Sequence, residues 1–534
     1  MKLNQALHSP VYNPGQTGDR QWTTSTSYSQ DVENHGDKAC PIRRGDACDR
    51  PDRRPLVVDV RKSPTEFLSC RRHTGEHPIP PHQPPPKQPR RTTLARPADR
   101  RILAIAVPAL GALIAEPLFL LADSAIVGRL GTTQLAALGV AGAILATTVN
   151  LFIFLAYGTT ASVARRAGAG DRGGAVDLGL DAAWLAAGLG VAVAALGWPL
   201  ASRLAGLFDI GPEVHAAAVT YLRWSLPGLP AMLLVLSQVG VLRGLGRNRF
   251  ALAVAGTGAV VNALLNLLLV HYAGWGIAGS AIGTVLTQTG MAVTVLGAVM
   301  RRAVTSGRSL HPHLRGIRMA GRAGVPLLIR TVAIRVDLLV TTGVAAHLGA
   351  AELAAHQVAV NVWALLLLAL DALAIAGQSL TGAGLGAGDV AAVRADTARM
   401  VRWGLGAGVL LGLVLLVAGG LMGPWFSPDP AVRSALAAAL LVAAIAQPVT
   451  GIVCVLDGVL IGAGDGRFLA WAALFQTLVF IPAALAVGAW APPSRIGLAL
   501  LWAVFAGGWM SLRAAMLGWR ARDSAWLVTG SGAR

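Results

Sequence analysis

Lysine is absent from this chain after Lys87, and the later basic residues are arginines and histidines. A phosphate-binding P-loop needs Gly-Lys-Ser or Gly-Lys-Thr, so the chain beyond residue 87 holds no ATP-driven motor of that kind. The four cysteines are too few and too scattered for a disulfide framework. HExxH motifs, paired cysteines and GxSxG elbows are also missing from the apolar region, which argues against the common hydrolase classes.

Charged residues are scarce as well. They make up 13% of the 534 residues, against 54% that are hydrophobic, and the mean hydropathy is +0.57. This balance is typical of a polytopic membrane protein. The net charge of +18 does not indicate a nucleic-acid partner, because the arginines are scattered between apolar segments instead of forming one basic face. Lipid head groups are the partner that such a distribution fits.

Residues 1–100 are polar and rich in proline, and they contain no long apolar run. Such a segment cannot bury enough apolar surface to offset the entropy of ordering, so we expect a disordered cytoplasmic extension. The stretch from Cys70 to His77 resembles zinc-finger spacing, with Cys40 and Cys48 upstream. A second close cysteine pair and an apolar core are missing, so we expect no metal site.

Twelve apolar segments follow, each near the roughly 20 residues that cross a bilayer as a helix. The predicted spans are 102–127, 136–158, 178–199, 216–241, 251–271, 276–300, 323–346, 353–378, 401–423, 434–456, 468–490 and 496–519. The sequence therefore predicts an all-α membrane protein with twelve transmembrane helices.

The same unit occurs twice, at a fixed spacing of 218 positions. Eleven pairs share this spacing without a gap: Pro108/Pro326, Gly131/Gly349, Leu135/Leu353, Gly170/Gly388, Asp171/Asp389, Phe208/Phe426, Pro230/Pro448, Gly240/Gly458, Gly246/Gly464, Arg249/Arg467 and Phe250/Phe468. The Gly-Ala-Gly-Asp segments at 168–171 and 386–389 belong to the repeat, and we interpret them as helix-end turns, not nucleotide loops.

The positive-inside rule gives the orientation. Connections on one side carry 20 arginines, among them Arg165, Arg243 and Arg513, and those on the other side carry 4, which places both termini in the cytoplasm. Six spans per copy is an even number, so the two lobes form a parallel repeat. The predicted parts are a cytoplasmic extension (1–100), an N-terminal lobe (101–300), a basic cytoplasmic linker (301–322), a C-terminal lobe (323–519) and a cytoplasmic tail (520–534).

Ionisable groups inside the spans are functional candidates, because placing a charge in the hydrocarbon region is costly. Glu116 and Asp123 are seven residues apart in the first span, which puts them on one helical face with Pro117 between them. Asn262 and Asn266 share a face of the fifth span. Asp123 has no arginine on its own face of the span, and an acid without a fixed cation can take up and release protons. We therefore interpret Asp123 as the coupling site.

The second lobe carries a larger polar set: Arg330, Arg335 and Asp337 in the seventh span, Gln357, Asn361, Asp371 and Gln378 along one side of the eighth, and Asp457 near the end of the tenth. Two interpretations stay open. These residues line a cavity or ion site, or they join helices structurally, with Arg330 or Arg335 neutralising Asp337 or Asp371.

Several segments resemble the multidrug and toxic compound extrusion (MATE) family, in particular its DNA-damage-inducible protein F (DinF) branch. They are residues 115–118, 123–131, 242–246, 354–357, 371–378 and 456–458, within a resemblance that runs from about 102 to 519. This resemblance implies a two-lobed antiporter in which a proton or a sodium ion enters as an amphipathic, often cationic, molecule leaves.

The resemblance also implies that Asp123 binds the coupling ion. The family often has an Asn-x-x-x-Asp pair in the fifth span, whereas this chain has Asn262 and Asn266, so proton binding would depend on Asp123 with Glu116 nearby. The acids Asp337, Asp371 and Asp457 are candidates for a second-lobe site.

We therefore expect a monomeric secondary transporter of the inner membrane that exports small molecules by alternating access, with protons favoured over sodium and no cofactor. Export of a lipid-linked precursor is the main alternative, which Arg330 and Arg335 would favour through a cationic cavity. A polytopic enzyme is disfavoured by the missing motifs and short connections, and a passive channel by the lack of a ring of repeated charges.

Overall fold

The computed structural model describes residues 98–531, and all regular secondary structure in this range is helical. The N-lobe comprises α1 (Ala98–Gly128), α2 (Thr132–Leu151), α3 (Phe154–Gly168), α4 (Arg172–Gly206), α5 (Pro212–Ser225), α6 (Leu229–Gly244), α7 (Asn248–Leu267) and α8 (Gly276–Thr305). The C-lobe comprises α9 (Leu314–Leu348), α10 (Ala350–Gly386), α11 (Val390–Phe426), α12 (Pro430–Gly462), α13 (Gly466–Trp490), α14 (Arg495–Trp502) and α15 (Met510–Arg522). The predicted extension and its Cys70–His77 stretch lie outside the described residues.

Three short segments continue these helices into longer rods. A 3-10 turn, η1 (Leu226–Gly228), joins α5 to α6, and two π-helical segments, η2 (Leu268–Tyr272) and η3 (Ala503–Trp509), extend α7 and join α14 to α15. Residues 152–153 likewise join α2 to α3, and each of the twelve predicted spans falls in one such rod or in one long helix. Eleven rods are long and apolar enough to cross a bilayer. The twelfth is α9, which carries Arg330, Arg335 and Asp337 and occupies the place of α1 in the second repeat.

The turns between helices repeat their geometry in both lobes. Gly170 and Gly388 have φ angles of 84° and 75°, a left-handed conformation that favours glycine. The following aspartates cap the next helices: Asp171 accepts from the backbone N–H of Gly174 at 2.8 Å, and Asp389 accepts from that of Ala392 at 3.0 Å. The Gly-Ala-Gly-Asp segments are thus helix-end turns, as predicted.

The lobes meet where α3 packs against α10. A Cβ atom added to Gly168 would overlap the backbone of Ala383, and one added to Gly386 would overlap the backbone of Arg165. Gly386 and Ala383 lie 218 positions after Gly168 and Arg165, so the repeat relates the two contacts to each other. A pseudo-two-fold axis therefore passes between α3 and α10, which is the geometry of a parallel repeat.

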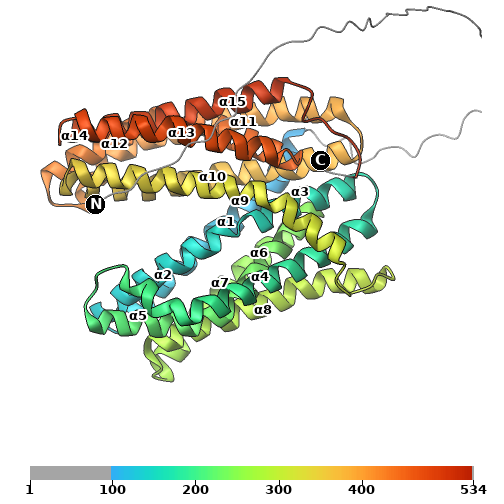
Figure 1. Ribbon diagram of the computed structural model, residues 1–534, viewed down its shortest axis with the longest axis horizontal. Coiled ribbons are helices and arrows are strands. Elements are labelled where there is room, and N and C mark those ends of the chain that lie inside the picture. The colour runs from blue at the N-terminus through green and yellow to red at the C-terminus, as the bar shows by residue number, and fades with distance from the viewer. Residues whose placement is uncertain (1–97, 532–534) are drawn as a thin grey trace, which may run out of the picture. The chain divides into compact units, whose positions relative to one another are not determined.

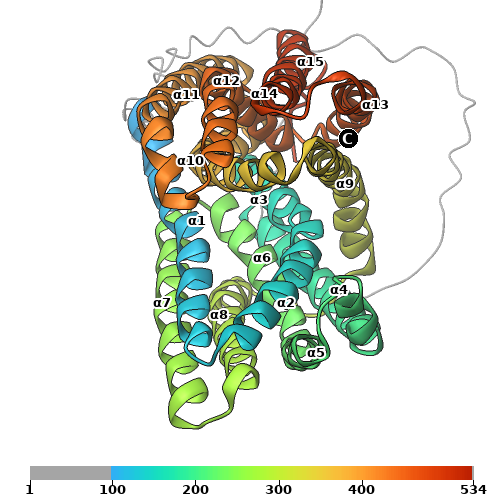
Figure 2. The ribbon, with the colours of Figure 1, turned by 90° about the vertical axis from the view of Figure 1, so that its left-hand side faces the viewer.

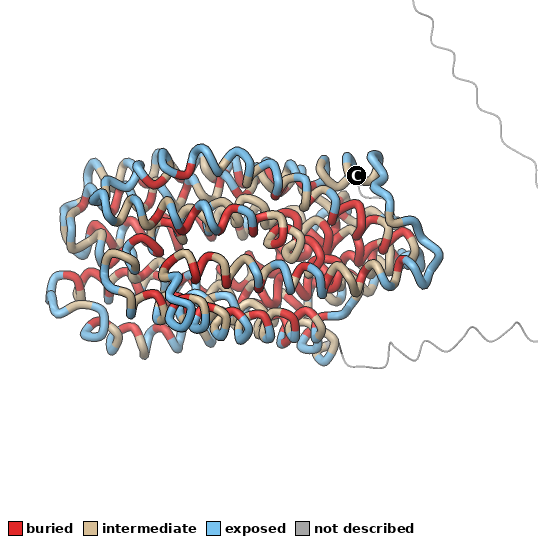
Figure 3. Tube along the Cα trace, turned by 90° about the horizontal axis from the view of Figure 1, so that it is seen from below, coloured by how far each residue is buried: buried red, intermediate tan, exposed pale blue. Residues whose placement is uncertain are grey.

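This contact lies at the end of the bundle where α1 begins and where α3, α10 and α15 end. We call this end of the bundle the arginine-rich end, because it carries Arg101, Arg166, Arg172, Arg394 and Arg520. In Figure 1 the lobes meet near the C mark and diverge toward the opposite end. Figure 2 looks along the helices and separates α1–α8 from α9–α15. Helix α1 lies beside both α7 and α10. Figure 3 shows buried positions concentrated at the end marked C.

The connection between the lobes is shorter than the predicted linker 301–322. Helix α8 continues to Thr305 and α9 begins at Leu314, because both helices extend beyond their apolar spans and arginine is a good helix former. The intervening residues are held to α4: Arg308 pairs with Asp177 at 3.1 Å, and the backbone N–H of His313 donates to Asp181 at 3.0 Å.

The close approach of α3 and α10 generates a stability prediction. Replacing Gly386 with alanine forces the helices apart, so we expect a loss of about 1–3 kcal/mol in the free energy of unfolding, as for other overpacked sites. Gly406→Ala is the control, because a Cβ there meets no atom within 4 Å. It should be neutral or slightly stabilising. Thermal unfolding in detergent compares the two, and equal midpoints would contradict the tight contact.

Candidate ion-coupling and substrate site

Asp123 lies inside the N-lobe and is only 2% exposed. Its Oδ1 atom accepts hydrogen bonds from the Ser280 hydroxyl and from Nδ2 of Asn266 at 2.8 Å, and its Oδ2 atom accepts from the Tyr221 hydroxyl at 3.3 Å. These donors come from α5, α7 and α8. Among residues 98–531, no arginine, lysine or histidine forms an ion pair with Asp123. The carboxyl group is thus satisfied by neutral donors alone.

Asn262 and Asn266 extend this polar cluster along α7, as their spacing predicted. Nδ2 of Asn266 also donates to Oδ1 of Asn262 at 3.1 Å, and Nδ2 of Asn262 donates to the Thr284 hydroxyl of α8 at 3.2 Å. Both asparagines are fully buried. The sequence pattern therefore located three members of the cluster, but it missed Tyr221, Ser280 and Thr284, whose residue types are common in membrane helices.

Glu116 is not part of this cluster. It is exposed, and within the described chain it makes no hydrogen bond or ion pair. Seven residues separate it from Asp123, which is roughly 10 Å along a helix, so a shared face does not bring the two carboxyl groups together. Glu116 instead lies one turn beyond Leu113, in the part of α1 that packs on Ala372 and Ile375 of α10.

Asp457 of α12 has the opposite environment. Arg513 of α15 contacts both of its oxygens, at 2.7 Å and 3.0 Å, and Nη2 of Arg330 donates to Oδ2 at 2.9 Å. Arg513 is 2% exposed and also donates to Gln476 at 2.9 Å. Asp457 is therefore committed to two arginines. Its position in the sequence groups Arg513 with the arginines of the connections, whereas its side chain is buried in the C-lobe.

One of the two open interpretations paired Arg330 or Arg335 with Asp337 or Asp371, and the structure shows no such ion pair among the described residues. Arg330 binds Asp457, and Asp337 accepts from Nε1 of Trp509 at 2.8 Å and from the Thr477 hydroxyl at 3.0 Å. Arg335 is partly exposed and has no carboxylate partner in the range 98–531. Periodicity assigns these residues to faces of α9, but their partners depend on which helices become neighbours.

The polar stripe of α10 changes its environment along the helix. Gln357 and Asn361 are exposed, Asp371 is partly exposed, and Gln378 is buried where α10 enters the contact between the lobes. Asp371 forms no hydrogen bond or ion pair with any described residue. It is the neighbour of Ala372, in the part of α10 that contacts α1.

The groups that act electrostatically on Asp371 come from both lobes. They are Arg330 and Asp457 of the C-lobe and Arg243 of α6 in the N-lobe. Tyr157 of α3 also lies close enough to interact electrostatically with Asp371. Arg243 had been counted as a residue of a connection, whereas it is only 8% exposed. A partly exposed acid and two arginines thus lie near the level at which the lobes meet.

The repeat does not duplicate these polar clusters. At a spacing of 218, Asp123, Asn262 and Asn266 correspond to Thr341, Phe480 and Ala484. In the reverse direction, Arg330 and Asp457 correspond to Ala112 and Val239. Each lobe therefore carries its own buried ionisable group, and the other lobe has no ionisable residue at the equivalent place.

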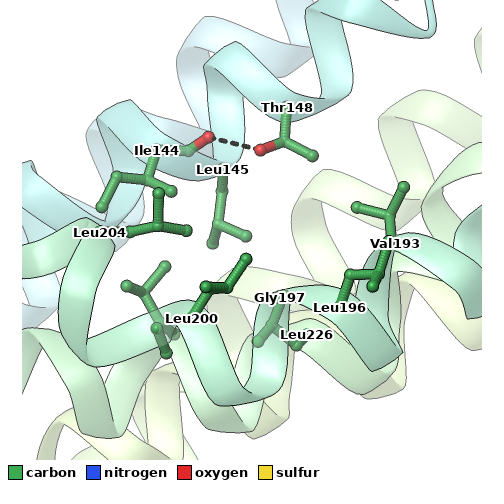
Figure 4. Close-up of a pocket in the computed structure, with 11 residues that line it drawn as sticks. Ile144, Leu145, Thr148, Val193, Leu196, Gly197, Leu200, Leu204 and Leu226 are labelled. Atoms are coloured by element: carbon green, nitrogen blue, oxygen red, sulfur yellow. Dashed lines mark hydrogen bonds between the residues drawn. The ribbon is translucent and has the colours of Figure 1, made fainter.

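A separate cavity of about 200 Å³ lies between α2, α4 and α5. Figure 4 shows its walls of Ile144, Leu145, Val193, Leu196, Leu200 and Leu204. The hydroxyl of Thr148, its one polar side chain, donates to the carbonyl of Ile144 at 2.9 Å and is thereby occupied. The cavity can hold apolar groups, but it offers no group for ion binding.

The chain resembles one known family in both of its lobes. The family profile described as MatE matches the chain twice, over residues 108–268 and 326–485. The two matches begin 218 positions apart, which is the spacing of the internal repeat.

Curated relatives match most of the same region. Protein DETOXIFICATION 45, chloroplastic, of Arabidopsis thaliana is 28% identical over 407 residues, which cover 71% of this chain and 72% of that protein. Multidrug resistance protein PmpM of Pseudomonas aeruginosa is 30% identical over 172 residues, or 32% of this chain and 36% of that protein.

Solved structures share the fold. A MOP superfamily transporter from Pyrococcus furiosus superimposes with a TM-score of 0.72 at 21% identity, covering 81% of this chain and 97% of that one. A multidrug resistance MATE family transporter described in an outward-facing conformation gives the same values. The predicted fold, twelve helices in two parallel-repeat lobes, is confirmed.

The two acids Asp457 and Asp371 differ in a way that stability measurements can detect. Asp457→Asn leaves the buried Arg513 and the partly buried Arg330 without a counter-charge, so we expect a loss of about 3–5 kcal/mol in the free energy of unfolding. Asp371→Asn removes no hydrogen bond or ion pair within residues 98–531 and should leave the thermal midpoint in detergent nearly unchanged. A similar loss in both variants would show that the difference in pairing is wrong.

Proposed function

The chain belongs to the MATE family of transporters, and we propose that it is a secondary active exporter that releases a small amphipathic or cationic molecule in exchange for a proton. The observation that carries this proposal is the environment of Asp123, which is buried, hydrogen-bonded to neutral groups and unpaired with any cation in the described chain. The name of PmpM, a multidrug resistance protein, supports the broad substrate class.

The hydrogen bonds of Asp123 favour a proton over a sodium ion. Sodium needs several oxygen ligands, whereas Asn266 presents its amide nitrogen to Asp123 and the cluster holds no second carboxylate. A protonated carboxyl group becomes a donor, and the hydroxyls of Ser280 and Tyr221 can rotate to accept from it. The Asn266 nitrogen cannot accept, so its contact would weaken. Proton uptake would thereby change how α1 is held to α5, α7 and α8, with Pro117 as a point where α1 can bend.

We place the arginine-rich end in the cytoplasm, following the positive-inside rule, and the protein in the inner membrane. The lobes touch at this end through α3 and α10 and diverge toward the other. That arrangement is the one expected of an exporter open to the outside, and transport would require the lobes to part at the cytoplasmic end in turn.

Substrate binding is assigned to the region where the lobes begin to diverge. Leu113 of α1 and Ile375 of α10 pack in the same cluster. Glu116 lies one turn after Leu113, and Asp371 lies one turn before Ile375. Both acids therefore lie on the sides of α1 and α10 that face each other. Each lobe thus supplies one acid that pairs with no other described residue, an arrangement suited to a cationic group. Arg330, one of the two arginines that would favour export of a lipid-linked anionic precursor, is bound to Asp457, so that alternative depends on Arg335 alone.

The coupling role of Asp123 predicts the effect of its neutralisation. In proteoliposomes with an imposed pH gradient, Asp123→Asn should abolish gradient-driven drug transport, because asparagine cannot exchange a proton. Binding of the drug to the detergent-solubilised variant should persist. Asp181→Asn, a buried acid at the arginine-rich end, serves as the control and should retain transport. Undiminished transport by Asp123→Asn with the same pH dependence would refute the assignment.

A different outcome is expected for Asp371. Asp371→Asn should raise the apparent KM for a cationic drug by about tenfold, equivalent to about 1.4 kcal/mol of lost attraction, and leave the dependence on the pH gradient intact. Glu213→Gln, an exposed acid of α5, should change neither quantity. An unchanged KM for Asp371→Asn, measured in the same vesicles, would exclude Asp371 from substrate binding.

A further inference from the structure

Arg165, in the last turn of α3, joins the N-lobe to three carbonyl groups of the C-lobe chain. Its Nη1 donates to the carbonyl of Ala463 at 2.8 Å, its Nε donates to that of Gly530 at 2.9 Å, and its Nη2 donates to that of Val528. The side chain is only 2% exposed. All three nitrogens of the guanidinium group are therefore engaged across the boundary between the lobes.

These carbonyls are the compensation for the buried charge. Within residues 98–531, no carboxylate forms an ion pair with Arg165. Ala463 is the C-cap of α12, a helix of 33 residues without a basic residue in its own last turn. The exposed carbonyls of a helix C-terminus carry partial negative charge, which a cation stabilises. Arg165 supplies that cation from the opposite lobe.

The other two carbonyls belong to residues 523–531, which we call the C-terminal segment. It is fixed to the C-lobe: the backbone N–H of Gly530 donates to the carbonyl of Leu385 at 3.1 Å, and Trp526 is only 2% exposed within the main core. Gly530 has a φ angle of 97°, which favours glycine and aims its carbonyl at Arg165. The segment thus extends the C-lobe over the end of α3.

The repeat shows that this contact is not required by the fold. The position equivalent to Arg165 in the second repeat is Ala383, which has no side chain to make such bonds. Other links at this end are weaker: Asp99 with Arg399, and Arg101 with Asp396 at 3.5 Å, are partly exposed ion pairs between α1 and α11, and exposed pairs contribute little.

We propose that Arg165 and the C-terminal segment form a latch that holds the arginine-rich end closed. The lobes can part at this end only when the guanidinium group leaves all three carbonyls, and a buried arginine without acceptors is strongly unfavourable. The latch sets the balance between the two conformations of the transporter. This proposal is separate from the proposed antiport, because the latch does not depend on Asp123 or on the coupling ion.

The test measures the distance between the lobes directly. Spin labels are placed on cysteines introduced at Arg172 of α4 and Arg394 of α11, two exposed positions at the arginine-rich end, after the native cysteines are replaced. The full chain is reconstituted in nanodiscs without drug, so the result is independent of transport. Pulsed electron resonance then gives the populations of short and long distances.

Arg165→Gln should increase the ratio of the long-distance to the short-distance population by about tenfold or more, since several charge-assisted hydrogen bonds are lost. Deletion of residues 527–534 should shift it in the same direction. Arg166→Gln is the matched control, because Arg166 pairs with Asp171 inside the N-lobe. Deletion of residues 532–534 controls for shortening the chain.

The proposal is overturned if Arg165→Gln and the 527–534 deletion keep the wild-type distribution, or if Arg166→Gln shifts it as far as Arg165→Gln does. Size-exclusion profiles establish that each variant is folded. Should Arg165→Gln misfold, Arg165→Lys replaces it: one nitrogen cannot reach three carbonyls, so an intermediate shift is expected and an unchanged distribution contradicts the latch.

Discussion

The constraint on which this structure depends is the charge of a carboxylate inside a membrane bundle. Such a charge is tolerated only with compensation, and the two lobes supply it differently. Asp123 is held by three neutral donors, whereas Asp457 is held by two arginines. A group stabilised by neutral donors can exchange a proton with only local rearrangement. A group between two fixed cations cannot do so without exposing them, so Asp457 serves the architecture of the C-lobe and Asp123 is free to serve coupling.

Duplication explains how this division arose on one scaffold. The turns with left-handed glycines, the aspartate caps and the glycine contacts between α3 and α10 recur in both lobes, because they determine where helices end and how the lobes meet. The interior polar groups do not recur. Thr341 stands where the first lobe has Asp123, and Val239 stands where the second lobe has Asp457. The frame has been preserved while the chemistry of each lobe has become distinct, and Arg165 adds a further asymmetry at the arginine-rich end.

The sequence was sufficient for the frame and for part of the site. Long apolar runs and a spacing of 218 predict twelve helices in two parallel lobes, and the spacing of Asn262 and Asn266 predicts the polar face that contacts Asp123. Periodicity assigns a residue to a face of its own helix, but it does not say which helix lies opposite. For that reason the interpretation that pairs helices through Arg330 names the wrong acid, and the sequence places Arg513 and Arg165 in connections although both are buried. Long-range packing decides those partners.

The central claim is that Asp123 gives up a proton when the transported molecule binds. The most direct measurement is the proton release that accompanies drug binding to the purified protein in weakly buffered solution, followed with a pH indicator at a pH where Asp123 is protonated before the drug is added. The account predicts close to one proton released per drug bound by the natural chain and none by Asp123→Asn. Equal release by both proteins, with equal drug binding, would contradict it.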